Sequence, residues 1–462
     1  MTSGNDVDVI VVGGGISGLA SAWLLHQRGV RVVLLEAAAR TGGTIATARE
    51  RGCLLESGPN SALETTPLIG SLFADLGIAH KRIAPNAAVH NRYVLRQGRL
   101  HALPLTPFAF LATRLFSTRA KLRILREPFI GRGAPDSEES VGGFVRRRLG
   151  MEFLDYAINP FVGGVYAGNP EALSLSAAFP RLHELEQQHG SLIRGYLLGA
   201  RARRRSPEKS KQTAPMFAFS DGMQTLTDAI AQHLPRVELG SEVTGGAAGR
   251  RWYVVNASTG SGRRELRARA VVLAVPAYAA ARIVMPFAPQ AAAALAAIPY
   301  APVAVAHSAY RRGVIAYRLD GFGMLVPGCE RRKILGTIFS SALFENRAPG
   351  ELALLTTFVG GMRQPALARL DDAELADMVH AEHAALLGAS ARPEFVRIRR
   401  WPQAIPQYTR GHSARIAQCE KTERDFPGLF FHANYRGGIS IGDCIKSAYF
   451  AAGEVTAFLG SA

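Results

Sequence analysis

Cysteine is scarce in this sequence, and its four cysteines stand far apart. They include no CxxC pair (Cys53, Cys329, Cys419 and Cys444). This spacing argues against a zinc site and a disulfide scaffold and fits a reducing compartment, so we expect no bound metal. The first eight residues, MTSGNDVD, are mostly polar or acidic. We therefore expect no secretory signal peptide.

Long uninterrupted apolar runs are also missing. Residues 283–306 carry no charge, but they contain four prolines and much alanine. A membrane-spanning helix needs about 20 strongly apolar residues in one piece. We expect this stretch to be a broken, buried part of a soluble fold, with no transmembrane span.

Acidic residues are few relative to basic ones. Lys and Arg number 54 against 37 Asp and Glu, which gives a net charge of +17. A surplus of positive charge can simply keep the protein surface soluble. Alternatively, the basic residues can bind an anionic substrate, an anionic membrane or nucleic acid. The chain has no zinc finger, no RNA-recognition aromatic signature and no clean basic helix, so we expect no nucleic-acid partner.

The 462 residues are enough for two or three domains, and the positions of the patterned segments suggest how these are arranged. Residues 7–12, 16–27 and 31–36 follow a strand, helix, strand pattern. Two further strands are expected at 251–258 and 267–280, and 428–459 reads as a strand, a glycine-rich turn and a helix. This predicts an α/β fold assembled from three parts of the chain, with other domains inserted between them.

A glycine motif lies between the first strand and the first helix. Gly13, Gly15 and Gly18 form GxGxxG. The first glycine allows a tight turn, the second lets a pyrophosphate approach the backbone, and the third permits close helix–strand packing. The phosphates would lie at the helix N-terminus beside Ile16 and Ser17. The motif in this context predicts a Rossmann-like dinucleotide site.

An acidic residue and a second glycine pair follow the next strand. Glu36 is placed to accept hydrogen bonds from a ribose. Arg40, Gly42 and Gly43 complete Glu-x3-Arg-x-Gly-Gly, which resembles the extension of the amine-oxidase-like FAD enzymes. Thr44 departs mildly from that superfamily, which often has arginine there. We therefore expect FAD, bound non-covalently.

The C-terminal glycine turn supplies another expected part of a flavin site. Gly442 and Asp443 would lie at a helix N-terminus aimed at the pyrimidine end of the flavin, where the positive end of the helix dipole stabilises the reduced ring. Residues 438–442 also fit the GxSxG pattern of hydrolases, but no HGGG-type loop accompanies them. No second GxGxxG is present, so electrons would pass to oxygen, a quinone or another protein.

Several segments resemble the protoporphyrinogen oxidases, the oxygen-dependent FAD enzymes of haem biosynthesis. The resemblance covers nearly the whole chain in order and is most specific between residues 159 and 191. The segments are 58–65, 91–104, 139–191, 325–341, 356–361, 404–412 and 434–444.

This resemblance implies a reaction and a set of site residues. The reaction is the six-electron oxidation of protoporphyrinogen IX to protoporphyrin IX with O2 as acceptor, giving H2O2. Arg92 matches the arginine that pairs with a substrate propionate, and Asn60 lies close to flavin and substrate. The apolar residues that sandwich the pyrrole rings are Leu325, Ile338 and Phe358. Further flavin contacts are Gly58, Pro59, Val243 and Trp401.

The resemblance also implies domains and partners. An FAD-binding domain would comprise 5–86, 218–283 and 412–462, and a substrate-binding domain 87–101, 190–217 and 284–411. Residues 102–189 would form a helical membrane-binding domain. Residues 104–130 mix large apolar and basic residues, which suits a surface that lies on an anionic bilayer, and the basic loop 201–211 would meet lipid headgroups. The predicted location is cytoplasmic, peripherally on the inner face of the membrane, with a homodimer and ferrochelatase as candidate partners.

Three alternatives stay open. The first is coproporphyrinogen III oxidation to coproporphyrin III by a homologous enzyme, which acts on four propionates. The second is an amine or carotenoid oxidase of the same FAD fold. The third is a non-catalytic tetrapyrrole carrier that keeps FAD only as structure.

Overall fold

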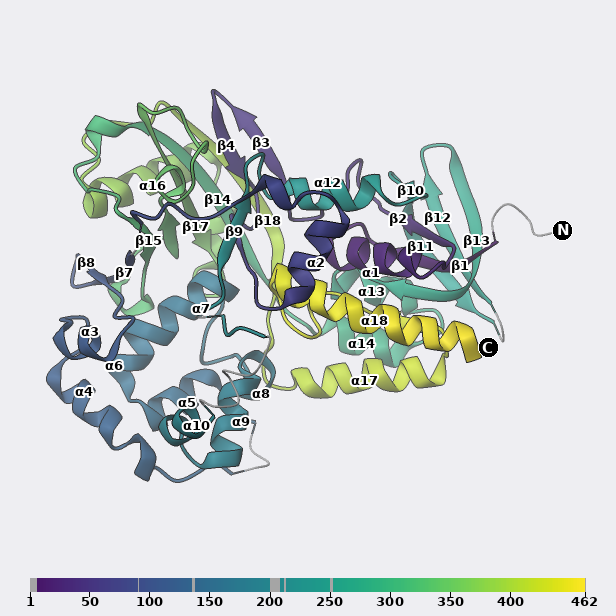
Figure 1. Ribbon diagram of the computed structural model, residues 1–462, viewed down its shortest axis with the longest axis horizontal. Coiled ribbons are helices and arrows are strands. Elements are labelled where there is room, and N and C mark those ends of the chain that lie inside the picture. Colours follow the sequence, from purple (N-terminus) through teal and green to yellow (C-terminus); the bar gives the residue numbers. More distant parts are fainter. Residues whose placement is uncertain are drawn as a thin grey trace.

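The computed structural model describes residues 6–89, 91–134, 138–199, 208–211, 213–249 and 252–461. Its first seven-stranded sheet lies near the described ends of the chain, and a second seven-stranded sheet lies at the other end of the long axis. A helical region lies beside the second sheet (Figure 1). Most of the basic loop 201–211 lies outside the described residues.

The first sheet takes its strands from the start, the middle and the end of the chain. Its order is β10–β2–β1–β13–β12–β11, and β19 also pairs with β13. The strands β10, β2, β1, β19 and the end of β13 run parallel, whereas β11 and β12 are antiparallel. The predicted α/β fold is therefore confirmed. The bounds are β1 Asp6–Val12, β2 Val32–Leu35, β10 Val237–Glu238, β11 Glu242–Ala248, β12 Tyr253–Thr259, β13 Gly262–Leu273 and β19 Leu429–Phe431.

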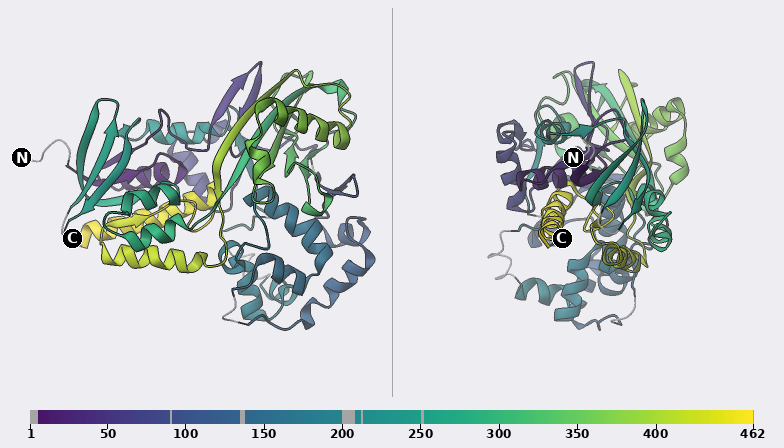
Figure 2. Two further views of the ribbon diagram at one scale, coloured as in Figure 1. Left: turned by 180° about the vertical axis from the view of Figure 1, so that it is seen from behind. Right: turned by 90° about the vertical axis from the view of Figure 1, so that its right-hand side faces the viewer.

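Helices cover both faces of this sheet, as the two views in Figure 2 show. Alternate side chains of β1 point to opposite faces, so that Val9 and Val11 enter one apolar core and Ile10 and Val12 the other. The first core is closed by α1 Ile16–Gln27, α2 Pro67–Asp75, α12 Gln224–Gln232 and α18 Ile441–Ser461. The second is closed by α13 Ala277–Val284, α14 Pro289–Ala296 and α17 His412–Asp425.

The uncharged stretch 283–306 is divided between three elements. It begins at the end of α13, continues through α14 and ends within β14 (Tyr300–Arg311), and most of its apolar side chains are buried. The prediction of a broken, buried stretch is confirmed. Within the described ranges, no helix is both long enough and apolar enough to cross a membrane.

The second sheet has the order β18–β14–β17–β16–β15–β7–β8 and is antiparallel except where β15 meets β7. The helix α16 (Asp372–Leu387) packs against it through Leu375 and Val379. The other strands are β7 Asn91–Arg96, β8 Arg99–Ala102, β15 Gly321–Leu325, β16 Gly336–Ile338, β17 Leu352–Gly360 and β18 Phe395–Pro406. Smaller pairings join β3 Thr47–Glu50 with β4 Cys53–Glu56, and β9 Met216–Phe219 with β5 Ala62–Leu63 and β6 Arg82–Ile83.

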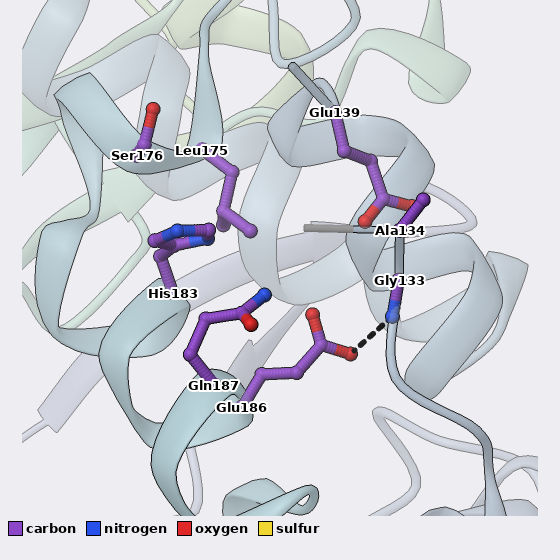
Figure 3. A pocket seen from close by; sticks show the side chains of 8 residues that line it. All are labelled: Gly133, Ala134, Glu139, Leu175, Ser176, His183, Glu186 and Gln187. Atoms are coloured by element: carbon purple, nitrogen blue, oxygen red, sulfur yellow. Dashed lines mark hydrogen bonds between the residues drawn. The ribbon is translucent and has the colours of Figure 1, made fainter. Parts of the chain in front are cut away.

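The helical region is held together by a buried cluster of charges. Arg148 is fully buried; its Nη1 lies 2.6 Å from Glu127 Oε1, and its Nε donates to Glu186 Oε1 at 2.6 Å. Arg147 joins Glu186 to Glu139, and Figure 3 shows both carboxylates beside a small pocket near Gly133. The helices are α3 Pro107–Ala112, α4 Thr118–Leu125, α5 Val141–Arg148, α6 Met151–Phe153, α7 Asn159–Tyr166, α8 Leu175–Ala178, α9 Pro180–His189 and α10 Leu192–Leu198.

The cluster keeps both carboxylates ionised. Desolvation raises the pKa of Glu127, but hydrogen bonds from Ser191, the Leu192 and Ile193 backbone and Arg148 outweigh it, so that its pKa lies below the usual 4.5. Desolvation of Glu186 is likewise outweighed by Arg147 and Arg148, which lowers its pKa. Because both pKa values are lowered by folding, the stabilisation is fully present above pH 4.5 and is lost as the pH falls through the folded-state values.

We predict that Arg148→Met destabilises the helical region strongly, because it leaves the buried Glu127 without its cation and Glu186 with Arg147 alone. The expected loss in the free energy of unfolding is about 3–5 kcal/mol, measured as a lower urea midpoint. The matched control is Arg146→Met, since Arg146 pairs with Glu171 in a solvent-exposed position. That loss should stay below about 1 kcal/mol; equal losses in the two variants would contradict the prediction.

Candidate active site

The GxGxxG turn is packed so closely that two of its glycines admit no side chain. A Cβ on Gly18 would lie 1.9 Å from the Gly13 carbonyl oxygen. Gly13 itself has φ +105°, and its Cβ would lie 2.7 Å from Ala274 O. By contrast, nothing lies within 4 Å of a Cβ on Gly15. Gly13 and Gly18 therefore let the strand, turn and helix touch, whereas Gly15 borders open space.

Two helix N-termini meet at this open space. The helix α1 begins at Ile16 with no side-chain cap, so its first N–H groups stay available to an anion. The Ser17 side chain hydrogen-bonds to Cys444 in the first turn of α18. The α18 terminus is capped by its own residues: Asp443 N donates to Ser440 Oγ and Ser440 N donates to Asp443 Oδ2, both at 3.2 Å. Lys211 Nζ lies 2.6 Å from the same carboxylate.

The residues after β2 fold back over the glycine turn. Glu36 accepts hydrogen bonds from the N–H groups of Gly14 (2.6 Å) and Ala38 (2.8 Å). Gly42 N donates to Gly14 O at 2.7 Å, and a Cβ on Gly43 would lie 3.5 Å from Gly15 Cα. The pair Gly42 and Gly43 thus lies against the turn.

Arg40 has a structural task in this loop. Its guanidinium donates to three carbonyl oxygens of its own loop, those of Thr41, Gly43 and Ile45. These bonds fix the loop over the dinucleotide groove. On the other side of Glu36, Ser241 N donates to Glu36 O at 2.8 Å. Val243 therefore lies two residues after a backbone contact to Glu36.

The segment 58–60 joins this groove to the second sheet. A Cβ on Gly58 would lie 2.1 Å from Thr44 O, so the segment touches the loop that Arg40 fixes. The side chain of the buried Asn60 donates to Gly58 O at 3.3 Å. Trp401 Nε1, from β18, donates to Ser57 O at 2.7 Å.

The three predicted pyrrole contacts lie on one face of the second sheet. The register places Gly336 between Leu325 and Phe358, and Ile338 two residues farther along β16. Their strands are otherwise almost wholly buried, yet Leu325, Ile338 and Phe358 each keep partial exposure. We call these three side chains the apolar platform. Ile338 and Phe358 pack at the margins of two apolar cores, and part of each of the three side chains remains accessible.

The platform has a helix against it and a free cation at its edge. A Cβ on Gly164 of α7 would lie 2.6 Å from Leu325 Cδ2, so the glycine lets α7 lie directly on the platform. Arg92, on β7, is exposed, and its Cζ lies 5.8 Å from the Phe322 ring centroid. No carboxylate among the described residues forms an ion pair with Arg92. This arrangement suits a flat apolar molecule that carries a carboxylate.

One buried carboxyl group near the groove was not identified from the sequence. Glu56, at the end of β4, is 2% exposed, and desolvation raises its pKa to about 7. It accepts hydrogen bonds from Met223 N and Thr47 Oγ1, both at 2.8 Å. The only sequence signal was a glutamate after the apolar run Cys53–Leu55. Its place next to Ser57 fixes the start of the segment 58–60.

Two other types of site, a metal centre and a hydrolase serine, were also compared with the part of the chain that the structure describes. No group of three or more His, Cys, Asp or Glu side chains there is placed to hold a metal ion. The Ser440 hydroxyl of the GxSxG pattern accepts from Asp443 N as a helix cap. The serine of the GxSxG pattern therefore caps the N-terminus of α18.

Comparisons with known proteins agree with this geometry. The family model of flavin-containing amine oxidoreductases matches residues 16–456. A mitochondrial protoporphyrinogen oxidase of Nicotiana tabacum is 34% identical over 98% of this chain and 95% of its own length. A coproporphyrinogen III oxidase of Bacillus subtilis is 28% identical, with 98% of each chain covered.

Solved structures share the fold. A crystal structure from Exiguobacterium sp. 255-15, provisionally assigned as a protoporphyrinogen oxidase, has a TM-score of 0.80 at 24% identity and covers 98% of this chain and 99% of its own. Cyclohexylamine oxidase of Brevibacterium oxydans has a TM-score of 0.68 at 19% identity, with 99% of each chain covered. At these identities the likeness concerns the fold alone.

We predict that Gly15→Val and Gly18→Val fail in different ways. The Gly15 side chain would enter open space, so the variant should fold normally but lose bound flavin by at least about tenfold, because a pyrophosphate needs that approach. The Gly18 side chain would collide with Gly13 O, so this variant should lose thermal stability as well as flavin. Flavin absorbance per protein and the melting temperature distinguish the two; normal flavin content in Gly15→Val would contradict the prediction.

The open space at Gly15, the two converging helix N-termini and the glycine loops fit an FAD molecule, and the matching family is that of flavin-containing enzymes. Non-covalent attachment is typical of that family. The chain is an FAD-dependent oxidoreductase, and it belongs to the flavin-containing amine oxidoreductases and, within them, to the protoporphyrinogen oxidase family.

Proposed function

We propose that this chain oxidises protoporphyrinogen IX to protoporphyrin IX with O2 as acceptor and H2O2 as by-product, the penultimate step of haem biosynthesis. The observation that carries the proposal is the partly exposed apolar platform with an unpaired arginine, Arg92, at its edge. The substrate is a flexible, apolar macrocycle with two propionates. Relatives named protoporphyrinogen oxidase support it at 34% identity over the full chain.

FAD, when bound, accepts two electrons in each of the three rounds that the six-electron oxidation needs. The apolar platform packs against the pyrrole rings and excludes water from the bridge that is oxidised. Arg92 holds a propionate through a bidentate pair, which fixes the ring in one orientation. The α18 N-terminus, with Gly442 and Asp443 in its first turn, would supply positive potential to the pyrimidine end of bound FAD.

The proposed site residues form two groups, one that binds the substrate and one that binds FAD. We propose Arg92, Asn60, Leu325, Ile338 and Phe358 as the residues that bind and position the substrate. The proposed FAD contacts are Gly13, Gly15, Ile16, Ser17, Gly18, Glu36, Arg40, Gly42, Gly43, Gly58, Pro59, Asn60, Val243, Trp401, Gly442 and Asp443. The division into an FAD-binding, a substrate-binding and a helical domain, with the boundaries given above, belongs to the same proposal.

Coproporphyrinogen III is the competing substrate. Relatives from Bacillus subtilis and Propionibacterium freudenreichii that are named coproporphyrinogen III oxidases are 28% and 32% identical to this chain. That substrate carries four propionates, so it would need cations on more than one side of the platform. The rates at which the two substrates reduce the flavin must therefore be compared directly to decide which of them the chain prefers.

An exposed apolar surface on α3 and α4 supports peripheral membrane attachment. Phe108 and Leu111 of α3, Leu122 and Leu125 of α4, and the nearby Phe129 are 59–83% exposed. Arg114, Arg119 and Arg126 lie exposed among them. A core helix with a solvated basic face would bury its apolar side chains, so this exposure favours a bilayer contact.

We propose that this apolar–basic surface attaches the chain to an anionic membrane on its cytoplasmic side. Apolar side chains would enter the acyl boundary, and the arginines would meet anionic headgroups. A homodimer and ferrochelatase are retained as candidate partners, without an assigned surface.

The decisive experiment mixes the detergent-stabilised holoprotein anaerobically with protoporphyrinogen IX and, separately, with coproporphyrinogen III. We expect faster loss of oxidised-flavin absorbance with protoporphyrinogen, followed by porphyrin fluorescence when air is admitted. Arg92→Met should raise KM about 10-fold or more, because a charge-assisted pair is lost. Arg99→Met, an exposed arginine on the next strand, is the control.

Each other result has a definite meaning. A strong preference for coproporphyrinogen would assign the chain to that substrate. Reduction by simple amines alone would make it an amine oxidase. Flavin that no substrate reduces would leave a flavin-bearing tetrapyrrole binder.

The membrane proposal predicts selective binding to vesicles. The holoprotein should co-sediment with phosphatidylglycerol vesicles more than with phosphatidylcholine vesicles, and less at high salt. The triple variant Phe108→Ser/Leu125→Ser/Phe129→Ser should bind at least about tenfold more weakly, because each buried side chain contributes about 1.5–3 kcal/mol. Phe450→Ser removes an equally exposed residue on α18 and should bind normally; equal loss in both would contradict the proposal.

A further inference from the structure

The carboxylate of Asp443 lies where its negative charge opposes the positive end of α18. The residue is in the first turn of this helix, which runs from the middle of the molecule toward the C-terminus (Figure 1). A helix N-terminus carries about half a positive charge, whereas a carboxylate carries a full negative one. Asp443 alone would therefore reverse the potential that α18 presents to the groove.

Lys211 supplies the positive charge that balances this carboxylate. Its Nζ lies 2.6 Å from Asp443 Oδ2, the oxygen that also accepts a hydrogen bond from Ser440 N at 3.2 Å. The Asp443 side chain is only 19% exposed, so water and salt screen its charge in part. With the carboxylate and the ammonium paired, the potential at the start of α18 stays positive.

The backbone around Lys211 is attached to the same helix end. In the segment 208–211, Lys209 N donates to Thr65 O at 2.9 Å. Thr65 in turn lies against the first turn of α18, because a Cβ on Gly442 would be 3.1 Å from Thr65 Oγ1. The segment that carries Lys211 is therefore fixed beside the start of α18.

The start of α18 belongs to the proposed flavin site. The Ser17 side chain, in the first turn of α1, hydrogen-bonds to Cys444, so the two helix ends touch. Gly15, just before α1, borders open space. The proposed contacts Gly442 and Asp443 would place the pyrimidine end of FAD at this point. A flavin that accepts a hydride gains one negative charge, so positive potential here stabilises the reduced form selectively.

We propose that Lys211 raises the reduction potential of the bound flavin, because it neutralises Asp443 and keeps the start of α18 positive. This inference rests on the proposed FAD contacts and does not depend on which substrate is oxidised. Lys211 acts through Asp443 and needs no contact with the flavin or the substrate. It is therefore a positioning residue, whose effect is electrostatic.

The competing explanation is that the ion pair only fastens the segment 208–211 to α18. Both explanations use the same contact, so loss of activity alone does not separate them. If the pair is only a fastening, Lys211→Met and Asp443→Asn break the same contact and shift the flavin potential in the same direction or not at all. If Lys211 acts through its charge, the two substitutions shift the potential in opposite directions.

The test measures the midpoint potential of FAD in the detergent-stabilised holoprotein, by anaerobic equilibration with a reference dye. In Lys211→Met, the ratio of reduced to oxidised flavin at a fixed potential should fall about 3- to 10-fold, a shift of about 15–30 mV. In Asp443→Asn, which keeps an acceptor for Ser440 N but removes the charge, the ratio should rise. The double variant lacks both charges, so its potential should return to the wild-type value.

Two control variants accompany this comparison. Lys211→Arg keeps the charge and should keep the wild-type potential. Lys209→Met removes an exposed lysine two residues earlier in the same segment and should also leave the potential unchanged. An equal shift in Lys209→Met would overturn the proposal, because it would trace the effect to the net charge of the segment.

The direction of the shifts decides between the two explanations. Shifts of the same sign in Lys211→Met and Asp443→Asn, or no shift in either, would overturn the proposal. If Lys211→Met does not retain its flavin, Asp443→Asn decides, since its potential must rise. Failure of the wild type to oxidise either porphyrinogen would instead overturn the proposed function, and it would leave the measured potentials unaffected.

Discussion

The meeting of two helix N-termini at the carboxyl edge of one sheet is the constraint on which the site depends. The helix α1 reaches this edge only because Gly13 and Gly18 allow contact without side chains. The helix α18 arrives from the far end of the chain and touches Ser17 through Cys444. The uncapped α1 directs unpaired N–H groups toward the groove, and α18, whose first turn is capped by Ser440 and Asp443, points the positive end of its dipole the same way. The Arg40 loop, the segment 58–60 and the second sheet are arranged around that groove.

Sequence reasoning was most successful where the chemistry is local. The helix Ile16–Gln27 was predicted to the residue, and the roles of the glycines follow from steric rules that operate over a few positions. The strand predicted at 31–36 is one residue shorter at each end. Strand ends depend on the partner strand, which the sequence does not display.

Long-range contacts were beyond the reach of sequence patterns. Arg92, Leu325, Ile338 and Phe358 were identified only through family resemblance, because a lone arginine and three core-like residues carry no signal of their own. Their common face emerges from the register of β15, β16 and β17. Glu56 was missed for the same reason: only burial distinguishes it from ordinary charged residues.

The composition of the first sheet has a consequence for how the chain acquires its cofactor. The strand β13 pairs with β1 from the start of the chain and with β19 from its end. Contacts between residues so distant in sequence form slowly, because a long loop must close first. The groove is therefore incomplete until β19 and α18 have docked against the strands and helices that precede them in the chain. We therefore expect FAD to bind only after β19 and α18 have docked, so that bound FAD reports a sheet whose distant strands have already paired.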